Sequence, residues 1–141
     1  MADEQKKTVL KNNAELNKYM DELNEDVKLN IMNIREKSLM VSTIRAKWLG
    51  YLFKERENLS RIKDYRAALL KKKTENMPAS ALRLKSEDAI AGSDEKLVEL
   101  GNLQKITESN LDYIERALSI LNDFSWQIRN LVEVLKLEGM S

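Results

Sequence analysis

The sequence predicts an all-α protein whose long amphipathic helices form a helical bundle. Its 141 residues include four glycines and one proline among many Leu, Lys, Glu, Asn and Ala, so turn formers are scarce and helix formers are abundant. Apolar residues recur at steps of three and four, which places them on one face of a helix. A chain of this length, with 43% apolar residues, is expected to form one domain with a modest core.

The first 20 residues are predicted to be a polar N-terminal extension with a weak helix that needs a partner. Few of its side chains are apolar: Val9, Leu10, Leu16, Tyr19 and Met20. A stronger helical pattern follows in residues 21–77, where one face carries Leu23, Val27, Ile31 and Ile34. No proline or glycine separates this pattern from the helix around Lys47. Residues 22–73 are therefore either one long helix or two helices broken near Ser38 to Ser42.

A basic row runs along the helix predicted around residues 47–74. Five residues at steps of four and seven fall on a narrow strip beside the apolar face: Lys47, Lys54, Arg61, Tyr65 and Lys72. Charge is also segregated along the chain, since residues 54–85 carry a net charge of +6 and residues 86–141 one of −6. We expect the basic row to face solvent and to attract anions.

The single proline, Pro78, marks the end of this helical region. Proline lacks a backbone N–H and disfavours α geometry in the residue before it. Residues 78–93 also lose clean periodicity, so they are predicted to be a connector. Ser93 is the expected N-cap of the next helix, because Asp94 and Glu95 then place negative charge at its first turn.

Residues 94–141 are predicted to form a long C-terminal oligomerisation helix. Their apolar side chains alternate at steps of three and four over almost six heptads, which is the repeat of a coiled coil. At 1.5 Å per residue a helix from Asp94 to Glu138 is roughly 65 Å long, more than a domain of this size buries by itself. This stripe favours a bundle or ring of subunits, with a long intramolecular hairpin as the alternative. The predicted oligomerisation residues are Leu111, Ile114, Leu118, Leu121, Ile128, Leu131 and Leu135.

The composition argues against an enzyme. The chain has no histidine and no cysteine, which removes the usual general base, the common nucleophile pairs and most zinc ligands. Its glycines are too scattered for a phosphate-binding loop. We expect no catalytic residue, metal or cofactor, and we expect both tryptophans, Trp48 and Trp126, in the core. No apolar run is long enough to cross a bilayer and the polar start is no signal peptide, so we expect a soluble cytoplasmic protein.

A basic strip on a small helical oligomer suits single-stranded nucleic acid, because Lys and Arg meet the charge of the backbone without reading bases. The candidate DNA-binding residues are Lys54, Arg61, Tyr65, Arg66, Lys71, Lys72 and Lys73. The alternative is a coiled-coil structural or adaptor protein. Its basic segment would dock on an acidic protein partner or on its own acidic C-terminal helix.

Short matches to one known family pattern follow each other in order along the chain. Residues 23–49 align with that pattern without a gap, and residues 21–139 follow it overall. The matching residues are Leu23, Asp26, Val27, Lys47, Trp48, Leu49, Arg61, Ile62, Lys85, Ser86, Glu87, Ala117, Leu118, Trp126, Ile128, Arg129 and Leu131. On these residues the sequence resembles the UvsY recombination mediators of T4-like bacteriophages.

The stretch LLKKKT at residues 69–74 lies where this family has a Leu-Lys-Ala-Arg-Leu box implicated in binding single-stranded DNA. Lys71 matches the lysine of the box and Lys73 matches its arginine. Lys72 replaces the alanine, and Thr74 replaces the second leucine. The charge of the box is therefore kept while its packing residues differ.

The resemblance implies a protein that forms a hexameric or heptameric ring through its C-terminal helix and binds single-stranded DNA. It further implies contacts with the phage single-strand-binding protein and with a UvsX-type recombinase. In that role the protein loads the recombinase onto DNA covered by the single-strand-binding protein, during DNA recombination and repair. The same resemblance places it in the cytoplasm of the infected host cell.

Overall fold

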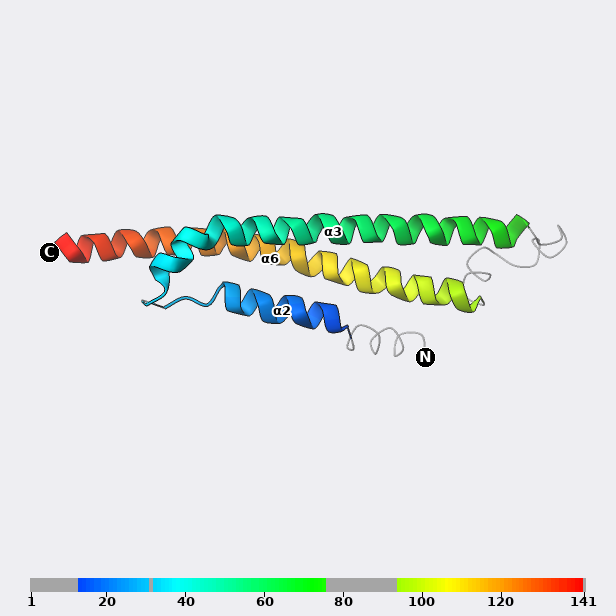
Figure 1. The fold of residues 1–141 in the computed structure, drawn as a ribbon, viewed down its shortest axis with the longest axis horizontal. Coiled ribbons are helices and arrows are strands. Elements are labelled where there is room, and N and C mark those ends of the chain that lie inside the picture. The colour runs from blue at the N-terminus through cyan, green and yellow to red at the C-terminus, as the bar shows by residue number, and fades with distance from the viewer. Residues whose placement is uncertain (1–12, 31, 76–93, 141) are drawn as a thin grey trace. The chain divides into compact units, whose positions relative to one another are not determined.

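The described part of the chain contains three α-helices and no strand (Figure 1). The computed structural model describes residues 13–30, 32–75 and 94–140. Its helices are α2 (Ala14–Asp26), α3 (Ile34–Glu75) and α6 (Glu95–Met140). The predicted fold class, all-α with long helices, is confirmed. The predicted connector and most of the predicted N-terminal extension lie outside the described residues.

The helices belong to two compact units. The first unit contains residues 55–75 and 94–109, and the second contains residues 14–54 and 110–140. Both α3 and α6 continue from one unit into the other without a break in the helix. The sequence pattern did not predict this division.

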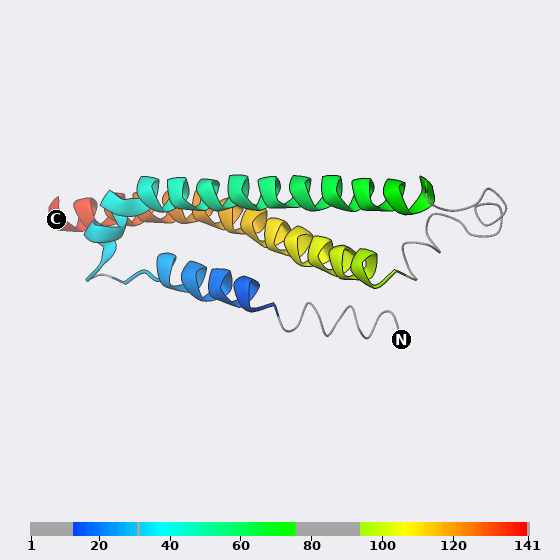
Figure 2. The same ribbon diagram turned by 45° about the vertical axis from the view of Figure 1, so that its right-hand side comes forward.

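The second unit has a core to which all three helices contribute. Its buried apolar residues are Tyr19, Leu23, Ile34, Ile44, Trp48, Leu52, Leu111, Ile114, Ala117, Leu121, Phe124 and Ile128. Figure 2 shows α2 beside the first part of α3, where the ring of Trp48 lies 5.9 Å from that of Tyr19 and 5.3 Å from that of Tyr51. Burying a large apolar side chain contributes about 1.5–3 kcal/mol. Tyr19 and Leu23 therefore hold the short α2 in place, and its helix begins inside the segment predicted as an extension.

The first unit contains the last part of α3 and the first part of α6. Leu97 is fully buried here, and Leu59, Ile62 and Leu69 are half-buried, as the predicted apolar face of α3 requires. Thr107 is buried as well, and its hydroxyl donates a hydrogen bond to the carbonyl of Leu103 at 2.9 Å. Threonine satisfies its hydroxyl within the helix in this way.

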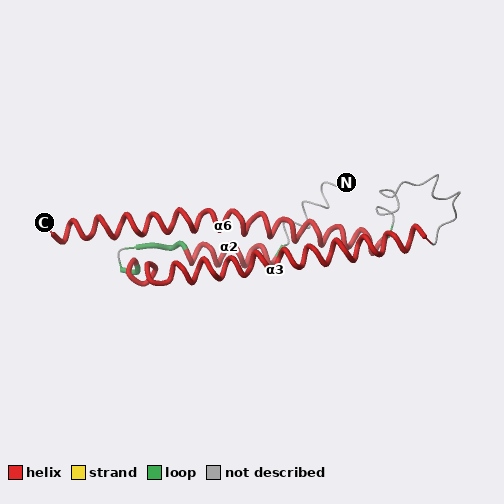
Figure 3. The backbone as a smooth tube through the Cα atoms, turned by 90° about the horizontal axis from the view of Figure 1, so that it is seen from above, coloured by secondary structure: helices red, strands yellow, loops and turns green. Residues whose placement is uncertain are grey.

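The link between α2 and α3 lies at residues 27–33, not near Ser38 to Ser42 (Figure 3). Asn30 Oδ1 accepts hydrogen bonds from the backbone N–H groups of Met32 and Asn33, at 2.9 and 3.0 Å. Asn33 Oδ1 accepts one from the Asn30 N–H at 2.8 Å. The helix predicted from the periodicity of Leu23 to Ile34 is therefore wrong in this stretch, because the asparagine side chains take the backbone donors that a helix would use.

The start of α6 is capped by Asp94. Its Oδ1 atom accepts a hydrogen bond from the Leu97 N–H at 3.1 Å, and its Oδ2 atom lies 2.5 Å from Lys73 Nζ. Ser93, the predicted N-cap, lies outside the described residues. Asp94 combines a capping side chain with a negative charge, and both favour a helix N-terminus.

Candidate nucleic-acid interface

In the second unit, the basic row of α3 faces carboxylates of α2. Glu15, Glu22 and Asp26 share one side of α2, and we call them the α2 carboxylate face. Lys47 Nζ lies 2.8 Å from Asp26 Oδ2 and 3.0 Å from Glu22 Oε1, while Lys54 Nζ lies 3.3 Å from Glu15 Oε1. These two lysines are therefore already paired with anions of their own chain.

The electrostatics of Lys47 reflect this pairing. Burial alone lowers the pKa of its ammonium group, but the hydrogen bonds to Asp26 and Glu22 and the negative charges of these carboxylates together outweigh burial, so the pKa lies above its ordinary value. Burial, followed by the Glu22 carboxylate, likewise raises the pKa of Tyr51, whose hydroxyl donates to Glu22 Oε1 at 2.8 Å. Trp48 Nε1 donates to Asp26 Oδ2 at 2.8 Å. The first part of the row thus joins α2 to α3.

The free part of the basic row lies in the first unit. Arg61 and Lys72 are exposed, and Tyr65 has 51% of its surface exposed. Arg61 Nη2 lies 2.6 Å from Glu57 Oε1, but this ion pair is exposed and lies within one helix. Such pairs contribute about 0.3–0.5 kcal/mol to stability. Together with the neighbouring Lys71, these residues form what we call the distal patch. At 1.5 Å per residue it extends over about 16 Å of α3.

The three consecutive lysines point to different sides of α3, because successive residues are turned by about 100°. Lys72 continues the row, and Lys71 and Lys73 flank it. Neither Lys71 nor Lys72 has an ion-pair partner among the residues that the structure describes, whereas Lys73 is held by Asp94. The Lys73 ammonium is the main reason why the pKa of the Asp94 carboxyl lies below its ordinary value, followed by the Leu97 N–H.

Arg66 and Lys54 differ from their predicted role as free phosphate contacts. Arg66 is half-buried, and its Nη1 atom donates to Gln104 Oε1 at 3.4 Å. A Cβ atom at Gly101 would lie 3.7 Å from Arg66 Nη2, an ordinary van der Waals contact, so the guanidinium group packs against α6 at this position. Lys54 is paired with Glu15. Of the seven predicted residues, the structure leaves Arg61, Tyr65, Lys71 and Lys72 most available to a ligand.

The α2 carboxylate face was missed in the sequence analysis. Its spacing could have indicated it, since Glu15 and Glu22 are seven residues apart and so are Lys47 and Lys54. Matching steps of seven on two helices allow opposite charges to meet more than once.

The predicted oligomerisation residues divide into two groups. Leu111, Ile114, Leu121 and Ile128 are buried in the core of their own chain, and Leu118, Leu131 and Leu135 are half-buried. The intramolecular alternative thus accounts for most of this stripe. A neighbouring flank of α6 keeps large apolar side chains exposed, with Ile120 at 45% and Val134 at 48%.

The two tryptophans lie in opposite environments. Trp48 is buried as predicted, but the prediction for Trp126 is wrong, since 62% of its surface is exposed. The guanidinium carbon of Arg129 lies 5.4 Å from the centre of the Trp126 ring, a cation–π contact on the helix surface.

No group of His, Cys, Asp or Glu within the described ranges is arranged to hold a metal ion. None of the three described helices is both long and apolar enough to cross a membrane.

No protein-family model and no curated protein matches the sequence. Its structure is similar to crystal structures of the bacteriophage T4 recombination mediator protein UvsY. One, in lattice type IV, has a TM-score of 0.73 at 17% identity and covers 87% of this chain and 98% of that chain. Another, in lattice type II, has a TM-score of 0.71 at 14% identity and covers 87% and 96%. The chain has a UvsY-like fold, and the resemblance predicted from the sequence is confirmed at that level.

Proposed function

We propose, from the fold that it shares with UvsY, that this chain is a recombination mediator that binds single-stranded DNA. It helps a UvsX-type phage recombinase to load onto DNA covered by the phage single-strand-binding protein. This activity belongs to DNA recombination and repair in the cytoplasm of the infected host, and it includes no catalytic step by the mediator itself. The observation that carries the proposal is the structural match over most of both chains.

The distal patch supports the DNA-binding part of the proposal. Its cations are exposed, and Tyr65 offers a ring on which a base can stack. A single strand is flexible enough to follow such a patch along a helix. Affinity then comes from phosphates and stacking, so binding depends little on base sequence.

A hexameric or heptameric assembly fits this function. The apolar flank of α6 at Ile120 and Val134 supplies a surface for contacts with another subunit. Several distal patches on one strand would act as a single multivalent site, which raises affinity without new kinds of contact.

A coiled-coil adaptor is the second candidate, because the contacts of Lys47 and Lys54 with α2 and of Lys73 with Asp94 are made to acidic groups of a protein. In this case the basic side chains serve structure and protein docking. Such an adaptor would bind oligo-dT no better than a control protein of equal charge.

Fluorescence anisotropy with labelled oligo-dT over a series of salt concentrations tests the proposal. Lys72→Ala removes one phosphate contact per engaged subunit, so the slope of log K against log salt should fall by about 0.7 for each of them. Lys63→Ala is the matched control, since Lys63 is exposed on the same helix about 180° away from Lys72. An equal effect of the two variants would show that only overall charge matters, and would count against the distal patch.

A further inference from the structure

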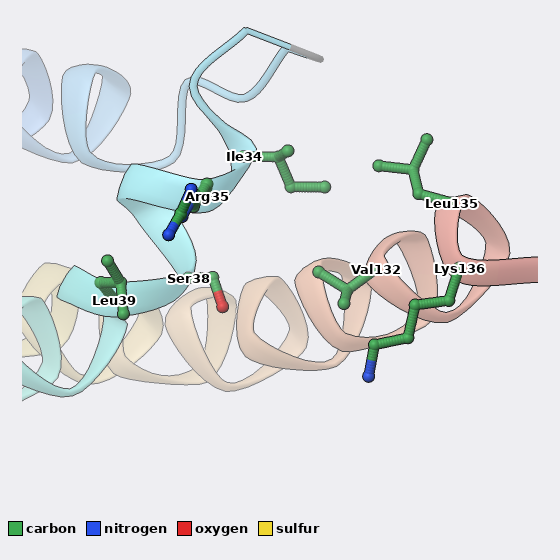
Figure 4. A pocket seen from close by; sticks show the side chains of 7 residues that line it. All are labelled: Ile34, Arg35, Ser38, Leu39, Val132, Leu135 and Lys136. Atoms are coloured by element: carbon green, nitrogen blue, oxygen red, sulfur yellow. The ribbon is translucent and has the colours of Figure 1, made fainter. Parts of the chain in front are cut away.

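A cleft in the second unit lies between the start of α3 and the last part of α6 (Figure 4). It has a volume of about 380 Å³, within the range of pockets that hold small ligands or single side chains. The residues that line it are Ile34, Arg35, Ser38, Leu39, Val132, Leu135 and Lys136. None of these residues is in the distal patch, and one of them, Leu135, is also a predicted oligomerisation residue.

The centre of the cleft is aliphatic. Ile34 and Leu135 extend toward each other from the two helices, and Val132 lies about one turn before Leu135 on α6 (Figure 4). Leu39, at one end, has 78% of its surface exposed. An apolar hollow bordered by an exposed leucine favours a ligand that brings an apolar side chain of its own, since the contact removes both surfaces from water.

Cations stand at the edge of this apolar centre, where Figure 4 shows the charged ends of Arg35 and Lys136 pointing away from it. Arg35 has no ion-pair partner within the described ranges. Among the described residues, the one ion pair of Lys136 is a long, exposed contact of 3.7 Å between its Nζ atom and Glu133 Oε1, which leaves it able to meet another carboxylate. No acidic residue lines the cleft, and α3 adds the partial positive charge of a helix N-terminus.

We propose that this cleft binds a short acidic peptide segment of a partner protein, with one bulky apolar side chain in the hollow and carboxylates beside Arg35 and Lys136. Apolar anchors in pockets and Arg or Lys around acidic motifs are two recurring modes of peptide recognition, and here they occur at one site. Single-stranded DNA is less suitable, because no aromatic residue lines the cleft for a base to stack on.

Binding can be measured by anisotropy with a fluorescein-labelled peptide Asp-Asp-Phe-Asp-Asp and the full chain. The peptide Asp-Asp-Ala-Asp-Asp keeps the charge but lacks the anchor, and Lys-Lys-Phe-Lys-Lys keeps the anchor but reverses the charge. Each should bind at least about tenfold more weakly, because burial of the ring and pairing of the carboxylates both contribute. Equal binding of the first two peptides would show nothing more than bulk charge attraction and would overturn the proposal.

Protein variants test the place of binding. The double substitution Arg35→Glu and Lys136→Glu should weaken binding of the phenylalanine peptide about tenfold or more. Arg45→Glu with Arg116→Glu is the matched control, because it makes the same charge change at exposed positions of the same helices that do not line the cleft. Circular dichroism should show that both variants keep the helix content of the wild type. Equal losses in the two variants would refute the site.

The chain has no cysteine, so Leu39→Cys can carry one environment-sensitive dye at the exposed edge of the cleft. The emission of this dye should shift to the blue with the phenylalanine peptide. A dye at Met40→Cys, which is exposed on another side of α3, should not respond. A shift that appears with oligo-dT would assign the cleft to nucleic acid instead. A shift that grows with protein concentration alone would assign it to a second copy of the chain. Either outcome would overturn the proposal.

Discussion

Because Lys47 pairs with carboxylates of α2, we expect this lysine to stabilise the fold and not to bind DNA. The substitution Lys47→Met keeps the length of the side chain and removes its charge. Lys47 meets both Asp26 and Glu22, and these three side chains are between 15% and 34% exposed. Hydrogen bonds to charged groups contribute about 1.5–3 kcal/mol when buried, and partial exposure reduces this value. We expect the substitution to lower the free energy of unfolding by about 1–2 kcal/mol.

Urea denaturation followed by circular dichroism measures this loss, and Lys54→Met is the control. Lys54 has a single, more exposed partner in Glu15, so its loss should be about 0.2–1 kcal/mol. DNA binding by Lys47→Met should change little, because α2 already occupies the ammonium group. Unchanged stability together with a flatter dependence of DNA binding on salt would refute this assignment.

The stabilising effect of Lys47 also has a defined dependence on pH. Because the folded state raises the pKa of this group, the stabilisation is fully present below the pKa of the unfolded chain, about 10.4 for a free lysine. It is lost as the pH rises through the higher folded value. The difference in stability between the wild type and Lys47→Met should therefore be constant near neutral pH and shrink in strongly alkaline solution. A difference that grows with alkaline pH would contradict the proposed pairing.

Three further predictions concern DNA binding and assembly. Changing Lys71 and Lys73 together to Ala should lower the salt slope of oligo-dT binding by several units if many subunits hold one strand, and by one or two units if a single subunit binds. Asp94→Asn keeps a good N-cap but removes the ion pair of Lys73, so oligo-dT should bind more tightly at low salt. Circular dichroism should show the same helix content as in the wild type. Unchanged affinity would mean that Lys73 does not reach DNA. Changing Ile120 and Val134 to Asp should leave the helices intact and reduce the mass measured by light scattering, whereas an unchanged mass would exclude this flank as a subunit contact.

Periodicity predicted the helices well where apolar packing decides the structure. The C-terminal helix was expected from residue 94 and is observed at Glu95–Met140, and Trp48 is buried as expected. Composition alone indicated the all-α class. These features follow from local propensity and from the spacing of apolar residues, both of which are visible in one sequence.

Features that depend on contacts between distant residues could not be predicted in the same way. The break at residues 27–33 is formed by the side chains of Asn30 and Asn33, which compete with the helix for backbone donors. The basic row was predicted to be a single exposed surface. In the structure Lys47 and Lys54 make ion pairs with carboxylates of α2, and the distal patch remains exposed. The exposure of a charged residue depends on which helix packs against it. The residue spacing within its own helix does not specify this packing.

The contrast between the two tryptophans gives the protein a built-in pair of optical reporters. Trp48 has 0% of its surface exposed and donates its indole N–H to Asp26, so its emission should be shielded from quenchers in solution. Trp126 is 62% exposed beside the positive Arg129, so an anionic quencher such as iodide should reach it readily. Iodide should therefore quench the fluorescence of Trp126 first and leave the fluorescence of Trp48. The remaining emission then reports on the contact between α2 and α3 without any added label.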